Sequence, residues 1–342
     1  MQAVLGPSDF IAQLNTGCVM LDVRSPGEYE QGHIPGALSF PLFTDEERAR
    51  VGKMYKQTGK EEAMELGLRI VGPKMADFVK TAKKLAPERR LAVHCWRGGQ
   101  RSGSMAWLFR QSGFEVVTLG GGYKAYRQHV LEHFGLFNPR IVVVGGKTGS
   151  GKTKVLHALR DLGEQIIDLE GIAHHKGSAF GFIGEMPQPT VEQFENDLFA
   201  AITQLDHSKR IWIENESKSI GRVFIPLNFW AKMKAAPLVN IEIPFEDRLQ
   251  NLLDDYVQTD PAELQLAFNK IASKLGGLNL KLASEALDNG NYTEAAKIAL
   301  SYYDKTYQHN LDVNVSPDIR NASFEQGDPA KIALALTQIQ GL

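Results

Sequence analysis

The feature that most constrains the fold of this 342-residue chain is a glycine-rich octapeptide that follows an apolar run. The octapeptide is GKTGSGKT at 146–153, and the run RIVVV precedes it at 140–144. The pattern matches a P-loop, in which backbone N–H groups close round phosphate oxygens at the start of a helix. Because a P-loop needs a strand before it and a helix after it, this part of the chain is predicted to form an α/β domain.

The octapeptide supplies the candidate phosphate-binding residues. They are Gly146, Lys147, Thr148, Gly149, Ser150, Gly151, Lys152 and Thr153. Lys152 adds positive charge, and Thr153 can reach a bound Mg²⁺. The ligand itself stays open, because ATP, GTP and the diphosphate of another substrate present the same oxygens. Glu214 and Glu216 end a later apolar run, where they could orient a metal ion or water, or could simply be solvated.

A second apolar run ends at Cys95, in the stretch VHCWRGGQRS at 93–102. The glycines and the segment that follows predict a loop leading into a helix. Backbone N–H groups there, with Arg97 and Arg101, would stabilise Cys95 as a thiolate and hold an incoming anion against it. Asp22 and Arg24 are expected to brace this loop rather than to react.

Composition indicates two folded domains. With 43% hydrophobic and 23% charged residues, the chain can bury real cores. We place the domains at 1–137 and 138–342, the second becoming helical from about 245. No leading basic and apolar segment and no run of membrane-spanning length is present, so we expect a cytoplasmic protein that does not bind a membrane. The only cysteines are Cys18, expected in a core, and Cys95.

The first domain alternates short apolar runs with helical patterns, which is typical of an α/β fold with a mainly parallel sheet. Strands are predicted at 19–23, 91–94 and 116–119, and helices at 75–85 and 102–112. The charged segment 44–72 is expected to lie on the surface.

The second domain repeats the α/β pattern and then becomes helical. Strands are predicted at 140–144, 165–168, 210–214 and 238–243, and helices at 247–256, 261–275, 278–288 and 293–303.

The net charge of −2 argues against a globally basic nucleic-acid binder. Residues 1–137 carry 18 Lys and Arg against 14 Asp and Glu, which gives +4, and the remainder carries 20 against 26, which gives −6. Any RNA contact must therefore use a local patch, and 48–60 and 74–90 are the candidates. The lysines at 80, 83 and 84 are more typical of the solvent-facing side of a helix.

Three segments of the first domain resemble a rhodanese domain over most of residues 5–130. They are DVRSPGEYEQGHIPGA at 22–37, the cysteine loop at 95–101 and LGGGYKAY at 119–126. The resemblance implies that Cys95 carries a transferable chalcogen, as a persulfide or its selenium equivalent. Five residues separate Cys95 from Arg101, one more than in ordinary sulfurtransferase loops, and this spacing is similar to that of rhodanese-fold phosphatases. The wider loop favours phosphate or a selenium species over plain sulfide.

A rhodanese domain fused to a P-loop domain resembles the tRNA 2-selenouridine synthase family. Further matching segments are 168–181, 187–190 and 212–217. The resemblance implies a transferase that acts on wobble 2-thiouridine in tRNA. It implies S-geranylation from geranyl diphosphate, then displacement of the geranylthio group by selenium from selenophosphate. No tightly bound cofactor is expected. Partners would be tRNA and the synthetase that supplies selenophosphate, and a monomer is favoured.

This scheme gives each loop a role. We hypothesise that the P-loop binds the prenyl diphosphate, with Mg²⁺ as an option, and that Cys95 takes selenium while Arg97 and Arg101 hold the phosphate of selenophosphate. His174 and His175 either contact substrate or pack in a loop, and no metal ligand set surrounds them. Four aromatic residues could line a prenyl slot, although core packing is the more common role; they are Phe180, Phe182, Phe229 and Trp230.

Two other function classes remain open. One is a rhodanese-fold phosphatase linked to a kinase-like domain, which the spacing from Cys95 to Arg101 favours. The other is a nucleotide-switched RNA-binding module without catalysis, against which the intact cysteine loop argues.

Overall fold

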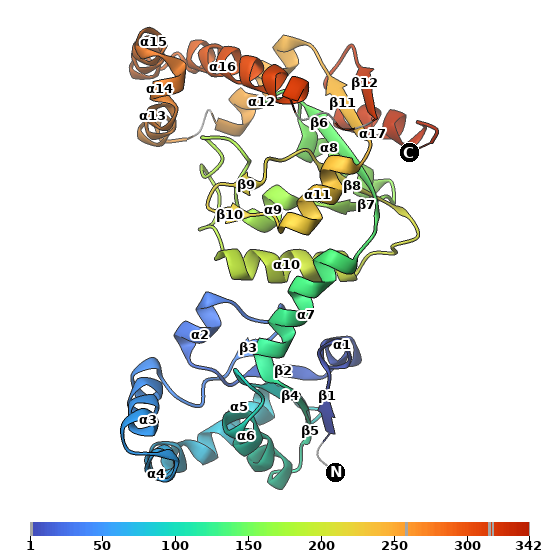
Figure 1. Ribbon diagram of the computed structural model, residues 1–342. Coiled ribbons are helices and arrows are strands. Elements are labelled where there is room, and N and C mark those ends of the chain that lie inside the picture. The colour runs from blue at the N-terminus through green and yellow to red at the C-terminus, as the bar shows by residue number, and fades with distance from the viewer. Residues whose placement is uncertain (1–2, 257–258, 314–315, 317, 342) are drawn as a thin grey trace. The chain divides into compact units, whose positions relative to one another are not determined.

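The computed structural model describes residues 3–256, 259–313, 316 and 318–341. The chain forms two compact units, 1–133 and 134–342 (Figure 1). Helix α7, Gly122–Leu136, passes from one unit into the other. The division therefore falls inside a helix, four residues before the boundary at 137/138 that we place from the sequence.

The first unit is built on a parallel five-stranded sheet in the order β1-β5-β4-β2-β3. The strands are β1 Ala3–Leu5, β2 Val19–Asp22, β3 Leu38–Ser39, β4 Arg90–His94 and β5 Glu115–Leu119. Register pairs Leu21 with Val93 and Val93 with Thr118, so β4 lies between β2 and β5. The predicted parallel α/β class is confirmed, and the two missed strands are the short edge strands β1 and β3.

Helices and short 3₁₀ turns connect these strands. They are α1 Pro7–Ala12, α2 Pro26–Gln31, α3 Asp45–Gln57, α4 Lys60–Val71, α5 Met75–Leu85 and α6 Gln100–Gln111, with 3₁₀ turns at Gln13–Thr16 and Gly72–Lys74. The charged segment 44–72 is thus two helices. Thr44 caps the first of them, because its hydroxyl accepts from the Glu47 N–H while the Glu47 carboxylate accepts from the Thr44 N–H.

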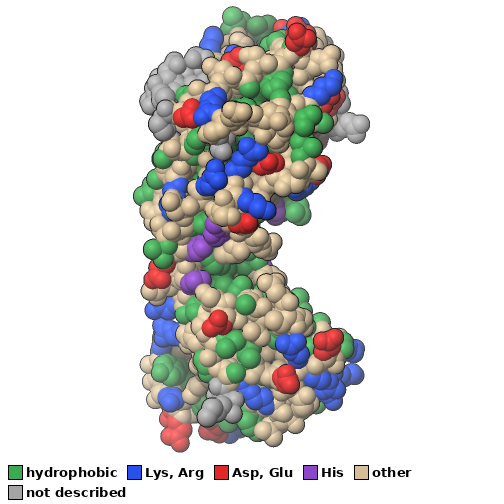
Figure 2. All heavy atoms as spheres, turned by 90° about the vertical axis from the view of Figure 1, so that its right-hand side faces the viewer, with side chains coloured by type: hydrophobic (Ala, Val, Ile, Leu, Met, Phe, Trp, Pro, Cys, Tyr) green, Lys and Arg blue, Asp and Glu red, His purple; other side chains and the backbone are tan. Residues whose placement is uncertain are grey.

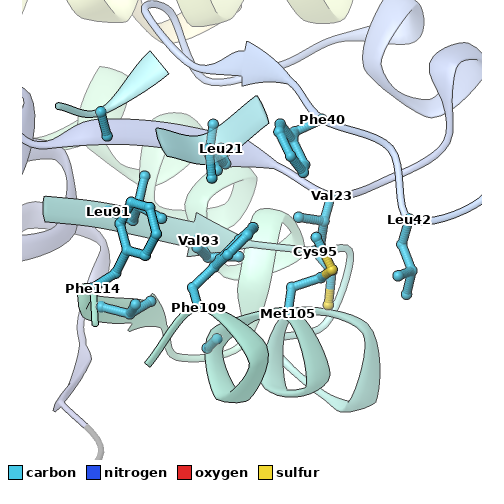
Figure 3. Packing of buried hydrophobic residues seen from close by; sticks show 14 of the residues in the cluster. Leu21, Val23, Phe40, Leu42, Leu91, Val93, Cys95, Met105, Phe109 and Phe114 are labelled. Carbon is cyan, nitrogen blue, oxygen red and sulfur yellow. The ribbon is translucent and has the colours of Figure 1, made fainter. Parts of the chain in front are cut away.

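The core of the first unit places the cysteine at its edge. Figure 3 shows Leu21 and Val93 of the sheet packed near Phe109 of α6, with Cys95 at the end of the cluster away from Phe114. Burial of β4 on both faces explains its continuous apolar run. Cys18 is also buried, as predicted, and burial raises the pKa of its thiol.

The second unit has its own parallel sheet, in the order β12-β11-β6-β8-β7. The strands are β6 Arg140–Gly146, β7 Gln165–Ile167, β8 Arg210–Glu214, β11 Leu238–Glu242 and β12 Ile319–Ser323; β9 Ser219–Ile220 and β10 Val223–Phe224 form a separate antiparallel pair. The expectation of a helical region from about 245 onward is wrong at β12. Its residues IRNAS are mostly polar, because it is an edge strand that pairs only with β11 among the described strands.

Ten helices of the described part of this unit complete its layers. They are α8 Lys152–Asp161, α9 Leu169–Ala173, α10 Val191–Thr203, α11 Leu227–Ala235, α12 Phe245–Tyr256, α13 Pro261–Lys270, α14 Ala272–Leu275, α15 Gly277–Asp288, α16 Tyr292–Val313 and α17 Pro329–Thr337. Helices α8 and α17 pack on the sheet through Leu156 and Leu336. Helices α13, α15 and α16 lie together (Figure 1), and their side chains form a separate apolar cluster. The helix predicted at 261–275 is interrupted at Ile271.

No helix in the described residues is both long enough and apolar enough to cross a membrane.

Candidate functional site

Cys95 follows the carboxyl end of β4 and lies in front of helix α6. Its sulfur is 3.2 Å from the Ser102 hydroxyl oxygen, and the residue is only 3% exposed. The helix begins five residues later, at Gln100. Ser102 belongs to the first turn of α6, so the thiol lies close to a helix N-terminus, where proteins commonly bind anions.

Two glycines allow the cysteine loop to pack tightly against the loop before α7. Gly98 has φ +63°, and a Cβ there would lie 2.5 Å from the Leu119 carbonyl oxygen. Gly122 also has φ +63°, and its Cβ would lie 2.4 Å from the Cys95 carbonyl oxygen. The Tyr123 N–H donates to that same oxygen over 2.8 Å. Neither glycine can be replaced without moving the backbone that carries the thiol.

The two arginines of the loop have different surroundings. Arg97 is exposed. Arg101 donates to both carboxylate oxygens of Glu28, over 2.6 and 3.2 Å. Burial of the Glu28 carboxyl opposes its ionisation, but the hydrogen bonds and charge of Arg101 outweigh burial and lower the pKa of Glu28 to about 2. An anion at Cys95 would therefore have to share Arg101 with Glu28, a residue that sequence reasoning missed.

Asp22 and Arg24 form a fully buried ion pair behind the loop, with Arg24 Nη2 2.5 Å from Asp22 Oδ2. The guanidinium lies 3.7 Å from the centre of the Tyr123 ring. Because Tyr123 donates to the Cys95 carbonyl, the pair supports the loop from beneath. Buried His94 stays neutral, since desolvation lowers its pKa to about 4.

In the second unit, the P-loop lies between β6 and α8. Gly149 has φ +81°, and its Cβ would lie 2.6 Å from the Arg248 carbonyl oxygen; Gly151 has φ +73°. Lys152 Nζ donates to the Gly146 carbonyl oxygen over 3.3 Å. The Ser150 N–H donates to the Lys147 carbonyl oxygen over 3.0 Å, which closes the turn.

Helix α12 holds the P-loop from outside. Arg248 Nε donates to the Thr148 carbonyl oxygen and Asn251 Nδ2 donates to the Gly149 carbonyl oxygen, each over 2.9 Å. Arg248 is itself fixed by an ion pair with Asp304 of α16. Sequence reasoning missed these supports, because they lie about a hundred residues after the motif that they hold.

Three carboxyl groups gather beside the P-loop threonine. Thr153 Oγ1 donates to Glu170 Oε2 over 2.6 Å, and Glu214 Oε1 accepts from the Glu170 N–H over 2.7 Å. Burial, together with the charge of Glu170, raises the pKa of Glu216 to about 8 and that of Glu214 well above its usual range. The structure therefore brings both predicted carboxylates to the P-loop and adds Glu170, which sequence reasoning missed.

The two predicted histidines lie in different surroundings. His174 caps α9 with φ +50°, and its Nδ1 lies 3.0 Å from the Pro187 carbonyl oxygen. His175 is buried, and desolvation lowers its pKa. Among the described residues, no group of three or more His, Cys, Asp or Glu side chains is arranged to hold a metal ion.

A cavity of about 650 Å³ opens beside the P-loop. At one end it is lined by Gly151, Lys152, Thr153, Glu170 and Glu216; at the other it is lined by Phe180, Leu264, Phe268, Leu287, Ala295 and Ala299. Of the four aromatic residues considered from sequence, Phe180 is a lining residue. Phe229 instead packs in the core against Phe134 and Phe137.

Comparison with known proteins finds two family models along the chain. The model described as the tRNA 2-selenouridine synthase AAA domain matches residues 139–332, and the rhodanese-like domain model matches residues 6–129. Three relatives carry the name tRNA 2-selenouridine synthase. That of Hydrogenovibrio crunogenus is 36% identical over 85% of this chain and 89% of that protein. The Bdellovibrio bacteriovorus protein is 41% identical over 70% of this chain and 64% of that protein. The Sulfurovum protein is 33% identical over 92% of this chain and 95% of that protein.

Proposed function

Because the chain belongs to the tRNA 2-selenouridine synthase family, we propose that it converts wobble 2-thiouridine in tRNA to 2-selenouridine in two steps, using geranyl diphosphate and then selenophosphate. The observation that carries the proposal is the presence of two candidate anion sites in one chain: a thiol at a helix start and a P-loop beside a cavity of about 650 Å³. Each site fits one of the two phosphorus-containing substrates.

In the first step, the P-loop would hold the diphosphate of the prenyl donor. The thiocarbonyl sulfur of the base attacks C1 of the geranyl group, the C–O bond breaks, and the electron pair leaves with diphosphate. Backbone N–H groups of the loop and Lys152 bind the oxygens on which this charge develops. Alkylation is useful because it turns sulfur into part of a thiol leaving group, which selenium can then displace by addition and elimination.

Magnesium would fit beside the P-loop. The Thr153 hydroxyl and the Glu170 carboxylate are already in contact, and Glu216 lies next to them, so hard oxygen ligands are available. A bound Mg²⁺ would supply positive charge for the departing diphosphate. Lys152 and the loop N–H groups bind the same oxygens through hydrogen bonds.

In the second step, the cysteine loop would bind selenophosphate. Selenium in this donor is already fully reduced, so attack of the Cys95 sulfur on selenium would have to expel phosphite. Attack on phosphorus balances: an S–P bond forms, the P–Se bond breaks, and selenide leaves with the electron pair, adds to the geranylated base and expels geranylthiol. Water then hydrolyses the S–P bond, which releases phosphate and restores the Cys95 thiol. The spacing of Cys95 and Arg101, which resembles that of phosphatase loops, favours this route over direct uptake of selenium.

Two variants separate the steps. Lys152→Ala should abolish geranylation of thiolated tRNA but leave selenation of pre-geranylated tRNA intact. Cys95→Ser should leave geranylation intact and abolish selenation of pre-geranylated tRNA. If Lys152→Ala geranylates normally, the P-loop assignment is wrong; if Cys95→Ser still converts geranylated tRNA, the thiol has no covalent role.

The intermediate can be identified by mass spectrometry of the peptide that contains Cys95, after rapid quenching with selenophosphate. A phosphoryl adduct supports attack on phosphorus. A selenium adduct accompanied by phosphite would contradict it and would support uptake of selenium by Cys95 instead.

A further inference from the structure

The cavity of the second unit has two chemically different ends. The phosphate end is formed by the P-loop, where Lys152 supplies positive charge. The far end is lined by side chains of the apolar cluster that α13, α15 and α16 enclose, including Leu264, Phe268 and Leu287. Polar groups, among them Lys176, Glu185 and Tyr292, also line the cavity. A ligand with an anionic head and an apolar body would match both the P-loop and the apolar wall.

Small side chains on α16 leave the far end open. Ala295 and Ala299 are buried within the apolar cluster and also line the cavity. They lie four residues apart, so they share one face of the helix. A larger residue at either position would project into the cavity. The size of the side chains at these two positions therefore limits the size of the ligand that can bind.

Aromatic rings form part of the wall. The rings of Phe180 and Phe268 pack edge to face with centroids 5.0 Å apart, and Tyr256 lies 6.2 Å from Phe180. The Tyr303 hydroxyl accepts from the Ala179 N–H over 3.0 Å, so it is already used within the protein. These contacts hold the wall in place and give it an apolar character.

We propose that this far end is a chamber for the hydrocarbon tail of a linear prenyl diphosphate whose diphosphate is bound by the P-loop. This inference rests on the proposed function and locates its first substrate. A buried nucleobase would need hydrogen-bond partners for its ring edges, and the five apolar side chains of this wall offer none, so only the tyrosine hydroxyls beside them, those of Tyr256, Tyr292 and Tyr303, could serve from this part of the lining. A hydrocarbon chain needs none and gains roughly fourfold in affinity per buried methylene.

Equilibrium binding to the full chain tests the proposal with three probes: inorganic pyrophosphate, geranyl diphosphate and ADP. Wild-type protein should bind geranyl diphosphate at least about a hundredfold more tightly than pyrophosphate. Ala299→Phe should weaken geranyl diphosphate at least about tenfold while leaving pyrophosphate within about twofold, because only the tail loses space. Ala262→Phe, an exposed alanine on α13 outside the lining, is the matched control and should change neither affinity.

A second variant, which makes the chamber larger, keeps the test valid if Ala299→Phe fails to fold. Phe268→Leu enlarges the chamber and should raise the affinity for farnesyl diphosphate relative to geranyl diphosphate by several fold. The proposal is overturned if geranyl diphosphate binds no better than pyrophosphate, if neither chamber variant changes the ratio between prenyl ligands and pyrophosphate, or if ADP binds more tightly than geranyl diphosphate and is weakened by Ala299→Phe.

Failure of this inference differs from failure of the proposed function. Binding of geranyl diphosphate that Lys152→Ala abolishes but the chamber variants leave unchanged would place the tail elsewhere and keep the function. Absence of both geranyl diphosphate binding and geranylation would refute both.

Discussion

At the scale of single residues, the protonation of Glu216 links the P-loop site to pH. Burial and the charge of Glu170 raise the pKa of Glu216 to about 8, whereas an unfolded chain would ionise it near 4.5. The native state therefore binds an extra proton between these values. Its free energy of unfolding must fall as pH rises from about 5 to about 8, because the unfolded state releases that proton first.

Glu216→Gln should remove this contribution, because the amide cannot ionise. The variant should match wild type near pH 5, become progressively the more stable of the two as pH rises toward 8, and keep that advantage above pH 8. Urea unfolding at pH 5, 7 and 9 measures the difference. A difference that stays constant across this range would mean that Glu216 is ionised throughout.

The ion pair between Glu28 and Arg101 has the opposite dependence on pH. The pKa of Glu28 is lowered to about 2, so its stabilising contribution is present above about pH 4.5 and is lost as pH falls toward 2. Both side chains are partly exposed, at 14% and 23%, which limits the effect. Glu28→Gln should cost about 1–2 kcal/mol at pH 7.

The Glu28→Gln loss should shrink as pH falls from about 4.5 toward 2, so it should already be smaller at pH 3 than at pH 7. Thermal unfolding of the two proteins at pH 7 and pH 3 makes the comparison. An equal loss at both values would show that packing of the side chain matters and its charge does not.

At the scale of elements, the turn that joins β5 to α7 controls the cysteine loop. Gly122→Ala would place a Cβ 2.4 Å from the Cys95 carbonyl oxygen and 2.7 Å from the Arg97 nitrogen, in a backbone with φ +63°. Both neighbours are backbone atoms and cannot rotate away. The change should cost more than about 2 kcal/mol and should also disturb the site around Cys95.

Gly113→Ala is the matched control. Gly113 also has a positive φ, +83°, but nothing lies within 4 Å of its Cβ position. Gly113→Ala should therefore lower the free energy of unfolding by only about 1 kcal/mol and leave selenation unchanged. Chemical denaturation and selenation of geranylated tRNA are measured on both variants. Because only Gly122→Ala adds a steric clash to the backbone strain, it should lose more stability and more activity than Gly113→Ala. Equal losses in the two variants would refute the close packing at Gly122.

Helices α3 and α4 carry the lysines that we predict to contact tRNA. Lys53, Lys56 and Lys60 are exposed on the surface of the first unit. Figure 2 shows that Lys and Arg side chains on the face drawn lie among acidic and neutral ones, so binding has to rely on local groups of charge. Reversing these three lysines to Glu should lower tRNA affinity and reduce the slope of log affinity against log salt by about 0.7–0.9 for each lysine–phosphate ion pair that is removed.

Reversal of the exposed lysines Lys80, Lys83 and Lys84 on α5 is the control, since these fit an ordinary solvated helix face. Filter binding at several salt concentrations measures both variants. If the two triple variants behave alike, net charge rather than the α3 and α4 surface governs binding.

The regular elements were largely predictable, because their signal is local. The apolar runs of β4 and β6 and the period of α5 are visible within about ten residues. The edge strand β12 was not, since a strand with mostly polar residues is defined by its partner β11 and not by its own pattern.

At the scale of the whole molecule, the sequence motifs identify the two anion sites but not what completes them. The P-loop cavity takes its walls from residues between 146 and 307, and its helical supports Arg248 and Asn251 follow the motif by about a hundred positions. Glu170 follows a short strand and lies in the matching segment 168–181, but nothing in that segment alone shows that its carboxylate would meet Thr153. Contacts at such separations are set by the fold of the chain, so the apolar end of the cavity could not be read from local patterns.

The central claim is that one chain performs both transfers on the same base of tRNA. The most direct test is nucleoside mass spectrometry of thiolated bacterial tRNA after incubation with the pure protein, geranyl diphosphate, Mg²⁺ and selenophosphate, with each small molecule omitted in turn. We predict geranylthiouridine without selenophosphate, selenouridine with the complete mixture, and unchanged thiouridine without geranyl diphosphate. Selenouridine formed without geranyl diphosphate, or thiouridine unchanged in the complete mixture, would contradict the account.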